Sequence, residues 1–294
     1  MADDRLDAKI ETAVPAAPPR PANAHKGTFG TVIVFGGCQT MIGAPALAAS
    51  AALRGGAGLV KIASTPEVVP LAITIEPGAT GIMLPQDPDK ISSLLDELDS
   101  DGRAVLAVGP GMGRDAAAGS LVASLWADKR AKVVDADGLN MLAAGGVTGT
   151  PGVGPAVMTP HPGEFRRLAA EVGITDDPTD TNTRPLAAAK LALAYQVVVV
   201  LKGHHSVVSN GQRTYINTTG NPSLSTAGTG DVLTGLVAAL IAQHMSPFDA
   251  SVLGVYLHGR AADHWSARCG ASGLTARDLA DLLPATMQDH RQMI

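Results

Sequence analysis

The chain has 294 residues, of which 46% are hydrophobic and 17% charged, a balance typical of a globular protein and not of a disordered one. The formal net charge is −5, and no basic stripe interleaved with aromatic residues occurs, which argues against nucleic acid as a partner. No apolar stretch is long enough to cross a membrane, and the acidic N-terminus lacks the apolar segment of a signal peptide. Only two cysteines occur, which suits a reducing compartment, so we expect a cytoplasmic protein.

Residues 1–24 are rich in Pro and Ala and show little periodicity, so we expect a loosely ordered, flexible N-terminal arm. From residue 25 onward, apolar strand-like runs alternate with helical stretches, which predicts βαβ units and a mostly parallel sheet. The predicted strands are Thr31–Phe35, Leu59–Ala63, Ala104–Val108, Lys132–Asp135, Ala156–Thr159 and Val197–Leu201. The predicted helices between them are Pro45–Arg54, Asp115–Ala127, Glu164–Ala170 and Pro185–Tyr195.

In the last third of the chain, Val207–Ser209 and Arg213–Ile216 indicate a hairpin with a tight Asn-Gly turn. The uncharged run Val232–Gln243 predicts a buried helix, and the chain from Pro247 onward is expected to be helical. Because the predicted strands are short, continuous and β-branched, helices should cover both faces of the sheet. No linker or internal repeat divides residues 25–294, so we expect a single domain.

Several glycine-rich or polar segments follow predicted strands immediately. In a parallel sheet, ligands bind beyond the carboxyl ends of the strands, so these segments should meet at one edge. They are Gly36-Gly37, Gly109–Gly113, Asp135–Asp137, Thr159–Glu164 and Lys202-Gly203. Their convergence indicates a ligand site more strongly than any one of them does.

The segment from Gly228 to Asp231 directly precedes the predicted buried helix. Bare backbone N–H groups at Gly228, Thr229 and Gly230, with the positive end of the helix dipole, suit phosphate oxygens. Asp231 could take a proton from a hydroxyl that attacks bound phosphate, or it could simply cap the helix. We expect the helix N-terminus to keep Asp231 acidic, which would make it a modest base.

Lys202 leaves a buried strand and could neutralise phosphate, while Gly203 and Ser206 would let the backbone run along a nucleotide. His204 and His205 are neighbours, and on an extended segment their side chains point to opposite faces, so they should not easily share an ion. The run Gly109–Gly113 is neither the dinucleotide-binding fingerprint nor a Walker lysine motif, and it suits either a plain turn or close approach to a ligand.

His161 and Glu164 stand three residues apart among prolines and glycine, without further ligands for a zinc site nearby. Contact of His161 with a substrate, and a magnesium-linked water on Glu164, suit this pair. Helix capping by Glu164, with His161 exposed, is the alternative.

Asp135 and Asp137 could be paired acid and base carboxylates, although this spacing more often places one side chain inward and one at a helix cap. We assign only Asp135 a role near a metal or substrate. We expect His258 and His264 to be ordinary residues on the face of a helix.

In this order, the motifs resemble the ADP-dependent NAD(P)H-hydrate dehydratase family, and the resemblance runs from His25 to about Leu283. It implies the ribokinase-like fold, an α/β three-layer sandwich with a mostly parallel central sheet and helices on both faces. The segments that carry it are Gly36-Gly37, Gly43–Pro45, Leu53–Val60, Gly109–Gly113, Asp135–Asn140, Thr159–Glu164, Leu201–Gly203 and Gly220–Pro222, followed by Ala227–Thr234.

The resemblance implies a hydro-lyase that repairs the S epimer of hydrated NADH or NADPH, with ADP as phosphoryl donor and magnesium as cofactor, releasing AMP and phosphate. Asp231 would be catalytic, and Glu164 would hold magnesium through water. The residues expected to contact the hydrated dinucleotide are Ala44, Gly111, Gly113, His161 and Asp231. Those expected to bind the adenine nucleotide are Lys202, Gly203, His204, His205, Ser206, Gly228, Thr229 and Gly230.

The resemblance also implies a homo-oligomer, with a tetramer favoured. The N-terminal arm is too short for an epimerase domain, so we expect that activity on a separate protein. The chain departs from the family at Cys38, Met41 and Ile42, where Ser, Tyr and Thr are frequent, and at Ser206 and Ser223, which replace Thr and Gly. The first three positions border the expected substrate pocket.

Two other functions are compatible with parts of this pattern. A ribokinase-like kinase for a vitamin precursor would share the fold and Asp231 but would use ATP; the Thr-Pro-His-Pro-Gly-Glu and Gly-Asn-Pro elements speak against it. A nucleotide sensor without turnover would have no need of Asp231.

Overall fold

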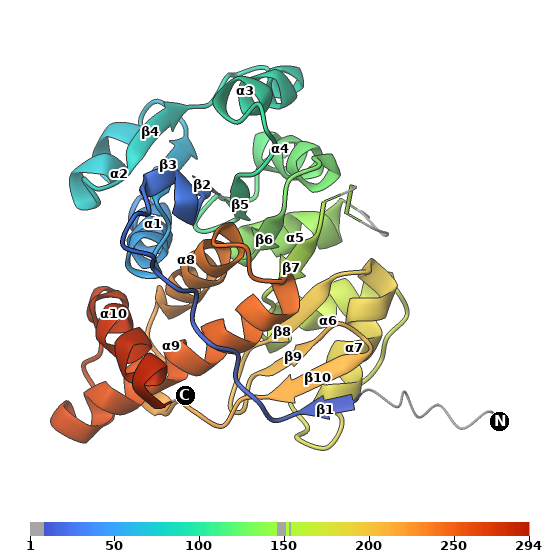
Figure 1. The fold of residues 1–294 in the computed structure, drawn as a ribbon. Coiled ribbons are helices and arrows are strands. Elements are labelled where there is room, and N and C mark those ends of the chain that lie inside the picture. Colours follow the sequence, from blue (N-terminus) through green and yellow to red (C-terminus); the bar gives the residue numbers. More distant parts are fainter. Residues whose placement is uncertain (1–8, 146–150, 153, 294) are drawn as a thin grey trace.

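The computed structural model describes residues 9–145, 151–152 and 154–293. Ten strands in this part of the chain form one sheet, in the order β1-β10-β9-β8-β7-β6-β5-β2-β3-β4 (Figure 1). They are β1 Lys9–Glu11, β2 Thr31–Phe35, β3 Leu59–Ser64, β4 Thr80–Met83, β5 Val105–Val108, β6 Lys132–Val134, β7 Ala156–Met158, β8 Val198–Leu201, β9 Val207–Ser209 and β10 Arg213–Ile216.

All pairs from β4 across to β8 are parallel, which confirms the predicted βαβ organisation. Only β9 pairs antiparallel, with β8 on one side and β10 on the other. The predicted hairpin is therefore present, and Gly211 in its turn has φ +88, a conformation that glycine adopts readily. Every strand predicted from the sequence is found, within one or two residues at its ends.

Helices cover both faces of the sheet, as expected (Figure 1). They are α1 Gly43–Arg54, α2 Val69–Ile75, α3 Ile91–Leu98, α4 Ala116–Ala127, α5 Ala136–Ala144, α6 Pro162–Glu171, α7 Arg184–Tyr195, α8 Thr229–Ala242, α9 Pro247–Cys269 and α10 Ala276–Met293. Short 3-10 helices also occur: η1 Lys26–Phe29, η2 Pro88–Lys90 and η3 Pro222–Leu224.

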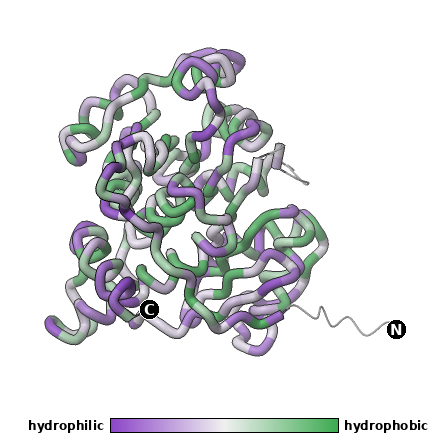
Figure 2. The backbone as a smooth tube through the Cα atoms, viewed as in Figure 1, coloured by the Kyte–Doolittle hydropathy of each residue, from purple (hydrophilic) through white to green (hydrophobic). Residues whose placement is uncertain are grey.

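Alternate residues of each strand serve two separate cores. In β2, Val32 and Val34 pack with α1, α2, α8, α9 and α10, whereas Ile33 and Phe35 pack with α3 to α7. Figure 2 shows hydrophobic residues along the central strands and hydrophilic ones in outer loops and helices. The result is the three-layer arrangement predicted from the sequence.

Close contact between α1 and α8 sets the position of the α8 N-terminus. A Cβ atom at Gly235 would lie 1.9 Å from the carbonyl oxygen of Ala48, so only glycine permits this approach. At Gly55, just after α1, a Cβ would lie 2.9 Å from Leu236 Cδ1. A chain with 3% aromatic residues thus builds its core from small and aliphatic side chains at short backbone separation.

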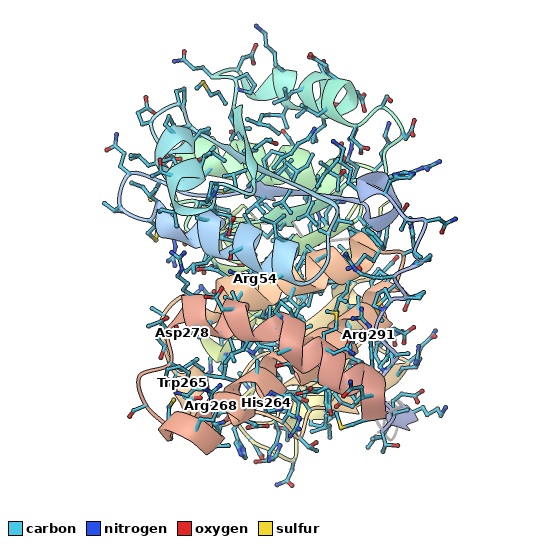
Figure 3. All side chains as sticks on the ribbon, turned by 60° about the vertical axis from the view of Figure 1, so that its left-hand side comes forward. Arg54, His264, Trp265, Arg268, Asp278 and Arg291 are labelled. Atoms are coloured by element: carbon cyan, nitrogen blue, oxygen red, sulfur yellow. The ribbon has the colours of Figure 1, made fainter. Side chains whose placement is uncertain are left out.

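The N-terminal segment differs from the loosely ordered arm expected up to residue 24. β1 pairs in parallel with β10 and extends the sheet by one strand. Further along, His290 Nε2 donates to the carbonyl of Pro15 at 2.9 Å, and Arg291, near the end of α10, donates to that of Pro18 at 3.0 Å (Figure 3). Proline carbonyls remain good acceptors, so a segment without periodicity can still be held along its backbone.

The elements α2, β4, α3 and α5 were not predicted from the sequence. Helix α2 has only seven residues, and β4 is an edge strand whose residues are mostly exposed, so their patterns are weak. Helix α3 is amphipathic but has only eight residues. No helix among the described residues combines the length and the apolar character needed to cross a membrane.

Replacing Gly235 with Ala tests the contact between α1 and α8. The added methyl would strike backbone, which cannot rotate away, so we expect the free energy of unfolding to fall by about 1–3 kcal/mol. Gly119→Ala in α4 is the matched control, since the nearest atom to its Cβ would be Met141 Cε at 3.8 Å. Urea denaturation should show the control unchanged or slightly more stable, because alanine favours helix. Equal stability of both variants would show that α8 can shift freely.

Candidate active site

The segments that follow β2, β5, β6, β7 and β8 meet at one edge of the sheet, as predicted. Gly37 N donates to the carbonyl of Pro110 at 2.9 Å, and Lys202 N donates to that of Pro160 at 2.8 Å. Gly109 has φ +117, and a Cβ there would lie 1.9 Å from the carbonyl oxygen of Asp135. These backbone contacts bring segments from distant parts of the sequence into one rim.

The N-terminus of α8 points into this rim. Gly228 adopts φ +89 at the cap position, and no side chain caps the helix there. Asp231 lies in the first turn instead of at the cap, so the capping interpretation does not hold for it. Backbone N–H groups in the first turn of a helix lack partners within the helix and are available to an anion.

Lys202 and Asp135 form a buried ion pair at the centre of the site. Lys202 Nζ lies 2.5 Å from Asp135 Oδ1, and the second oxygen of Asp135 accepts a hydrogen bond from Thr234 Oγ1 at 2.8 Å. Glu164 Oε2 lies 3.9 Å from the same ammonium. Burial lowers the pKa of Lys202, but attraction to Asp135 and Glu164 outweighs it and leaves that pKa above its ordinary value. Lys202 is therefore a cation.

Asp231 is less acidic than the sequence suggests. Burial, reinforced by repulsion from Asp135, raises the pKa of Asp231 to about 7, and attraction to Lys202 only partly opposes this. The expectation that the helix N-terminus keeps Asp231 acidic is wrong, because a helix dipole contributes about 1 kcal/mol or less whereas desolvation can move a pKa by several units. Burial likewise raises the pKa of Glu164 to about 7.

His161 and Glu164 form the N-terminal cap of α6. His161 Nδ1 accepts from the backbone N–H groups of Gly163 at 2.9 Å and Glu164 at 3.3 Å, while Glu164 Oε2 accepts from His161 N at 2.8 Å. The capping interpretation is therefore confirmed for this pair. Burial, with the nearby charges of Lys202 and Arg167, lowers the pKa of His161. Its half-exposed neutral ring remains open to a ligand.

Gly111 and Ala44, both expected to contact substrate, lie against each other: a Cβ at Gly111 would be 2.8 Å from Ala44 Cβ. Gly113 stands beside Cys38, and its N–H donates to Asp137 Oδ2 at 3.0 Å. Asp137 therefore holds the glycine loop in place and is not a partner of Asp135 in acid–base chemistry.

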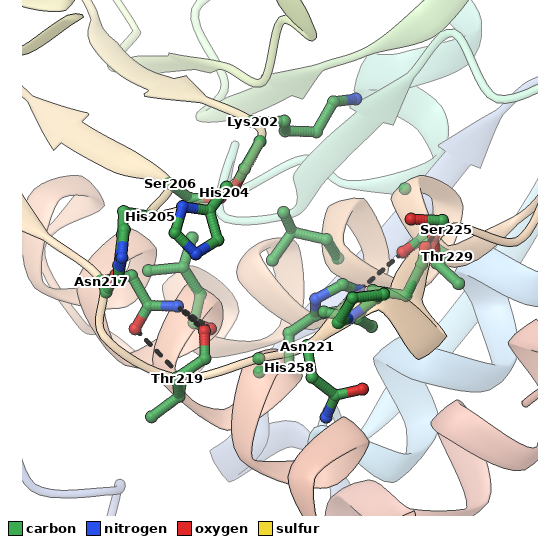
Figure 4. Close-up of a pocket in the computed structure, with 18 residues that line it drawn as sticks. Lys202, His204, His205, Ser206, Asn217, Thr219, Asn221, Ser225, Thr229 and His258 are labelled. Atoms are coloured by element: carbon green, nitrogen blue, oxygen red, sulfur yellow. Dashed lines mark hydrogen bonds between the residues drawn. The ribbon is translucent and has the colours of Figure 1, made fainter. Parts of the chain in front are cut away.

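A cavity of about 340 Å³ adjoins the α8 N-terminus (Figure 4). The residues that line it come from the segment after β8, from the segment between β10 and α8 that includes η3, and from helices α8 and α9. Those predicted to bind nucleotide are Lys202, Gly203, His204, His205, Ser206, Thr229 and Gly230; Gly228 lies outside the lining. Ala44, Gly111, Gly113 and His161 also lie outside it.

Asp231 is close enough to both groups of residues to interact with their charges. Its carboxylate experiences the charges of Lys202, on the cavity side, and of Asp137, which holds Gly113. The site thus has two parts, a cavity and a glycine-lined rim, and the carboxyl of Asp231 interacts with charges in both.

Two histidine predictions are wrong. His205 adopts φ +55, so the chain turns, and the rings of His204 and His205 lie with their centroids 3.9 Å apart instead of on opposite faces. His258, expected on an ordinary helix face, lines the cavity, and its Nε2 donates to the carbonyl of Thr229 at 2.8 Å (Figure 4). The sequence did contain one signal, the glycine that follows His258. In the structure, a Cβ at Gly259 would lie 2.2 Å from Thr219 Oγ1, so α9 approaches the segment that lines the cavity closely there.

Comparison with known proteins identifies the family of this chain. A model of the family described as NAD(P)H-hydrate dehydratase matches residues 32–285. An ADP-dependent (S)-NAD(P)H-hydrate dehydratase of Neisseria meningitidis is 38% identical over 89% of this chain and 86% of its own length. A bifunctional NAD(P)H-hydrate repair enzyme of Moorella thermoacetica is 42% identical over 92% of this chain, which spans only 52% of that protein.

Among solved structures, an ADP/ATP-dependent NAD(P)H-hydrate dehydratase of Bacillus subtilis, co-crystallised with ATP and Mg²⁺, superposes with a TM-score of 0.76. It is 29% identical and covers 94% of this chain and 95% of its own. A ribokinase-like superfamily protein of Enterococcus faecalis, 25% identical, superposes with a TM-score of 0.77, so the fold defines a protein of the ribokinase-like class. Within that class, the chain belongs to the NAD(P)H-hydrate dehydratase family. It spans about half the length of several bifunctional relatives.

The raised pKa of Asp231 predicts a pH-dependent effect on stability. A carboxyl whose pKa rises from 3.8 to about 7 on folding stabilises the native state fully below pH 4, and this contribution is lost as pH rises toward 7. Asp231→Asn, which mimics the neutral acid, should therefore match the wild-type melting temperature at pH 4 and exceed it at pH 8. A difference that does not change with pH would mean that Asp231 is well solvated.

Proposed function

We propose that this protein is an ADP-dependent (S)-NAD(P)H-hydrate dehydratase, which restores NADH or NADPH from the hydrated form and releases AMP and phosphate. The observation that carries the proposal is Asp231, an ionisable carboxyl in the first turn of α8, where that helix adjoins the cavity, and near the charges of Lys202 and Asp137. Membership of the family supports the choice of reaction. We further propose that residues 25–294 form one catalytic domain.

Hydroxide is a poor leaving group and phosphate is a good one, so phosphorylation of the hydroxyl makes its loss from the ring easier. The hydroxyl at C6 of the hydrated ring attacks the β-phosphorus of ADP, and the bond to AMP breaks. Asp231 accepts the hydroxyl proton. Phosphate then leaves C6 with the electron pair of the C–O bond, pushed by the ring nitrogen, and loss of a proton from C5 restores the double bond.

The pKa of Asp231 suits this step, because a base with a pKa near the working pH is more effective than an ordinary aspartate. Positioning and charge neutralisation contribute more to the rate, because the transition state of phosphoryl transfer has little bonding to the nucleophile. The first-turn N–H groups of α8 and the ammonium of Lys202 supply donors and positive charge for the phosphates. Ala44, Gly111, Gly113 and His161 would contact the dinucleotide.

Magnesium fits this site as a companion of the nucleotide. No group of three or more His, Cys, Asp or Glu that could hold a metal occurs in the described ranges, and Asp135 is paired with Lys202. Magnesium typically keeps several waters and binds through one or two carboxylates and substrate phosphates, so Glu164, through a water, is the protein group that fits. Bound there, it would neutralise charge on the phosphates.

The proposal extends to a cytoplasmic homo-oligomer, with a tetramer expected. Both cysteines are free, which suits a reducing compartment. Leu71 and Met83, in α2 and β4, are more than half exposed, and such side chains suit contact between copies.

A direct assay tests the function and the role of Asp231. The protein is mixed with hydrated NADH, magnesium and ADP, and the absorbance of reduced nicotinamide should rise; a parallel reaction contains ATP. Asp231→Asn should remain folded and bind ADP while its rate falls by roughly two to four powers of ten. No rise with either nucleotide would end the dehydratase proposal, and a stable phosphorylated product would favour a kinase.

His258 is expected to orient the phosphate donors. The carbonyl of Thr229 and the N–H of Gly230 belong to one trans peptide, so the hydrogen bond from His258 fixes the direction in which that N–H points. Burial lowers the pKa of His258 to about 4, so the ring is neutral and donates from Nε2.

Removing this donor should weaken nucleotide binding. We expect His258→Leu to raise the Kd for ADP roughly tenfold, while His258→Gln, which retains an N–H at similar reach, stays near wild type. Calorimetric titration with ADP measures both. If the Leu and Gln variants bind equally well, His258 acts only as a wall of the cavity.

A further inference from the structure

Two arginines border the glycine-lined rim of the site without belonging to the reaction centre. Arg114 directly follows Gly113, and Arg167 lies in α6, three residues after Glu164. Both are exposed, with the side chain of Arg114 60% accessible. They come from segments far apart in the sequence and converge on α5.

Each guanidinium is held by Nε alone. Arg114 Nε donates to Asp137 Oδ1 at 2.7 Å, and Arg167 Nε donates to Asn140 Oδ1 at 2.9 Å. Asp137 and Asn140 stand one turn apart in α5, joined by a hydrogen bond of 3.5 Å. The two arginines are therefore the ends of one short network, with their planes fixed and their terminal Nη groups without an acceptor in the described part of the chain.

Two other arginines, Arg184 and Arg130, use their terminal Nη groups differently. Arg184 donates through both Nη groups to the carbonyls of Leu201, Lys202 and His204. Arg130 is fully buried among carboxylates. The terminal Nη groups of Arg184 and Arg130 are bonded within the protein, whereas Arg114 and Arg167 are exposed to solvent.

The network also touches two residues expected to bind the dinucleotide. Asp137, which holds Arg114, accepts the N–H of Gly113 through its other oxygen. Arg167 is close enough to His161 to lower the pKa of that ring by charge repulsion. The paired guanidinium groups thus flank the rim at Gly113 and at His161.

Guanidinium forks that are fixed in orientation and open at both Nη atoms match phosphate oxygens, which they bind in bidentate fashion. Arg167 is held by a neutral amide, so its full positive charge is available to an anion. We propose that Arg114 and Arg167 form a subsite for a phosphate group of the dinucleotide substrate. This inference rests on the proposed function for the identity of the dinucleotide. The phosphate could be the backbone pyrophosphate or the 2′-phosphate that only NADPH carries.

Direct binding of NADPH and NADH to the intact protein tests the subsite without turnover, by nicotinamide fluorescence. Arg167→Leu and Arg114→Leu should each weaken binding of NADPH about tenfold, the size expected for a lost charged hydrogen bond. Arg167→Lys, which keeps the charge but not the fork, should fall between. The matched control is Arg166→Leu, because Arg166 is the neighbouring exposed arginine in α6 and pairs with Asp177. The Arg166→Leu variant should bind NADPH and NADH as the wild-type protein does.

The two nucleotides separate the sources of phosphate. A loss with NADPH alone identifies the 2′-phosphate, and an equal loss with both identifies the pyrophosphate. Unchanged binding of both nucleotides by the Leu variants, or an equal loss in the Arg166 control, overturns the subsite. In the repair assay, the Arg166→Leu control should keep wild-type kcat and KM. Wild-type protein that binds NADPH but fails to dehydrate the hydrate would refute the proposed function and leave the subsite standing.

Discussion

The structure depends most on the close approach of α8 to α1. Gly235 and the small residues of α1 let two backbones meet where any larger side chain would separate them. That contact fixes the axis of α8, and the axis fixes where its first turn delivers N–H groups and Asp231. The chemistry of the site therefore depends on helix packing at Gly235, one turn further along α8 than Asp231. Rigid support of this kind is what a site for phosphoryl transfer needs, since positioning provides much of its rate.

Much of the fold follows from local pattern. The β-branched runs of β2, β5 and β8 alternate with uncharged or amphipathic helices, and parallel strands buried on both faces leave a distinctive signal. The region from Ser64 to Arg103 lacks this signal, because short elements at the sheet edge bury little of their surface. The structure of the N-terminal segment is even harder to predict from its sequence. Its contacts are made by proline carbonyls and by a three-residue strand, and neither has a periodicity to detect.

The candidate site was predictable in membership but not in electrostatics. Strand ends and glycines indicate which segments converge, so Lys202, His161 and Asp231 could be grouped from the sequence. The charge state of Asp231 could not be predicted, because it depends on desolvation and on Asp135, which lies 96 residues earlier in the sequence. The positive φ of His205 and the inward position of His258 depend equally on tertiary contacts. Sequence patterns identify neighbours of a site better than they identify its protonation.

The three-residue strand β1 has a role beyond extending the sheet. It pairs with Arg213–Ile216, whose outward N–H and carbonyl groups would otherwise stand open along the side of β10. Open strand edges are templates for pairing with another molecule, and natural proteins cover them or place charge there. Lys9 and Glu11 put both signs of charge on the covering strand. Residues 9–11 thus reduce the tendency of this sheet edge to aggregate, and removing them would lower solubility while leaving every proposed catalytic group in place.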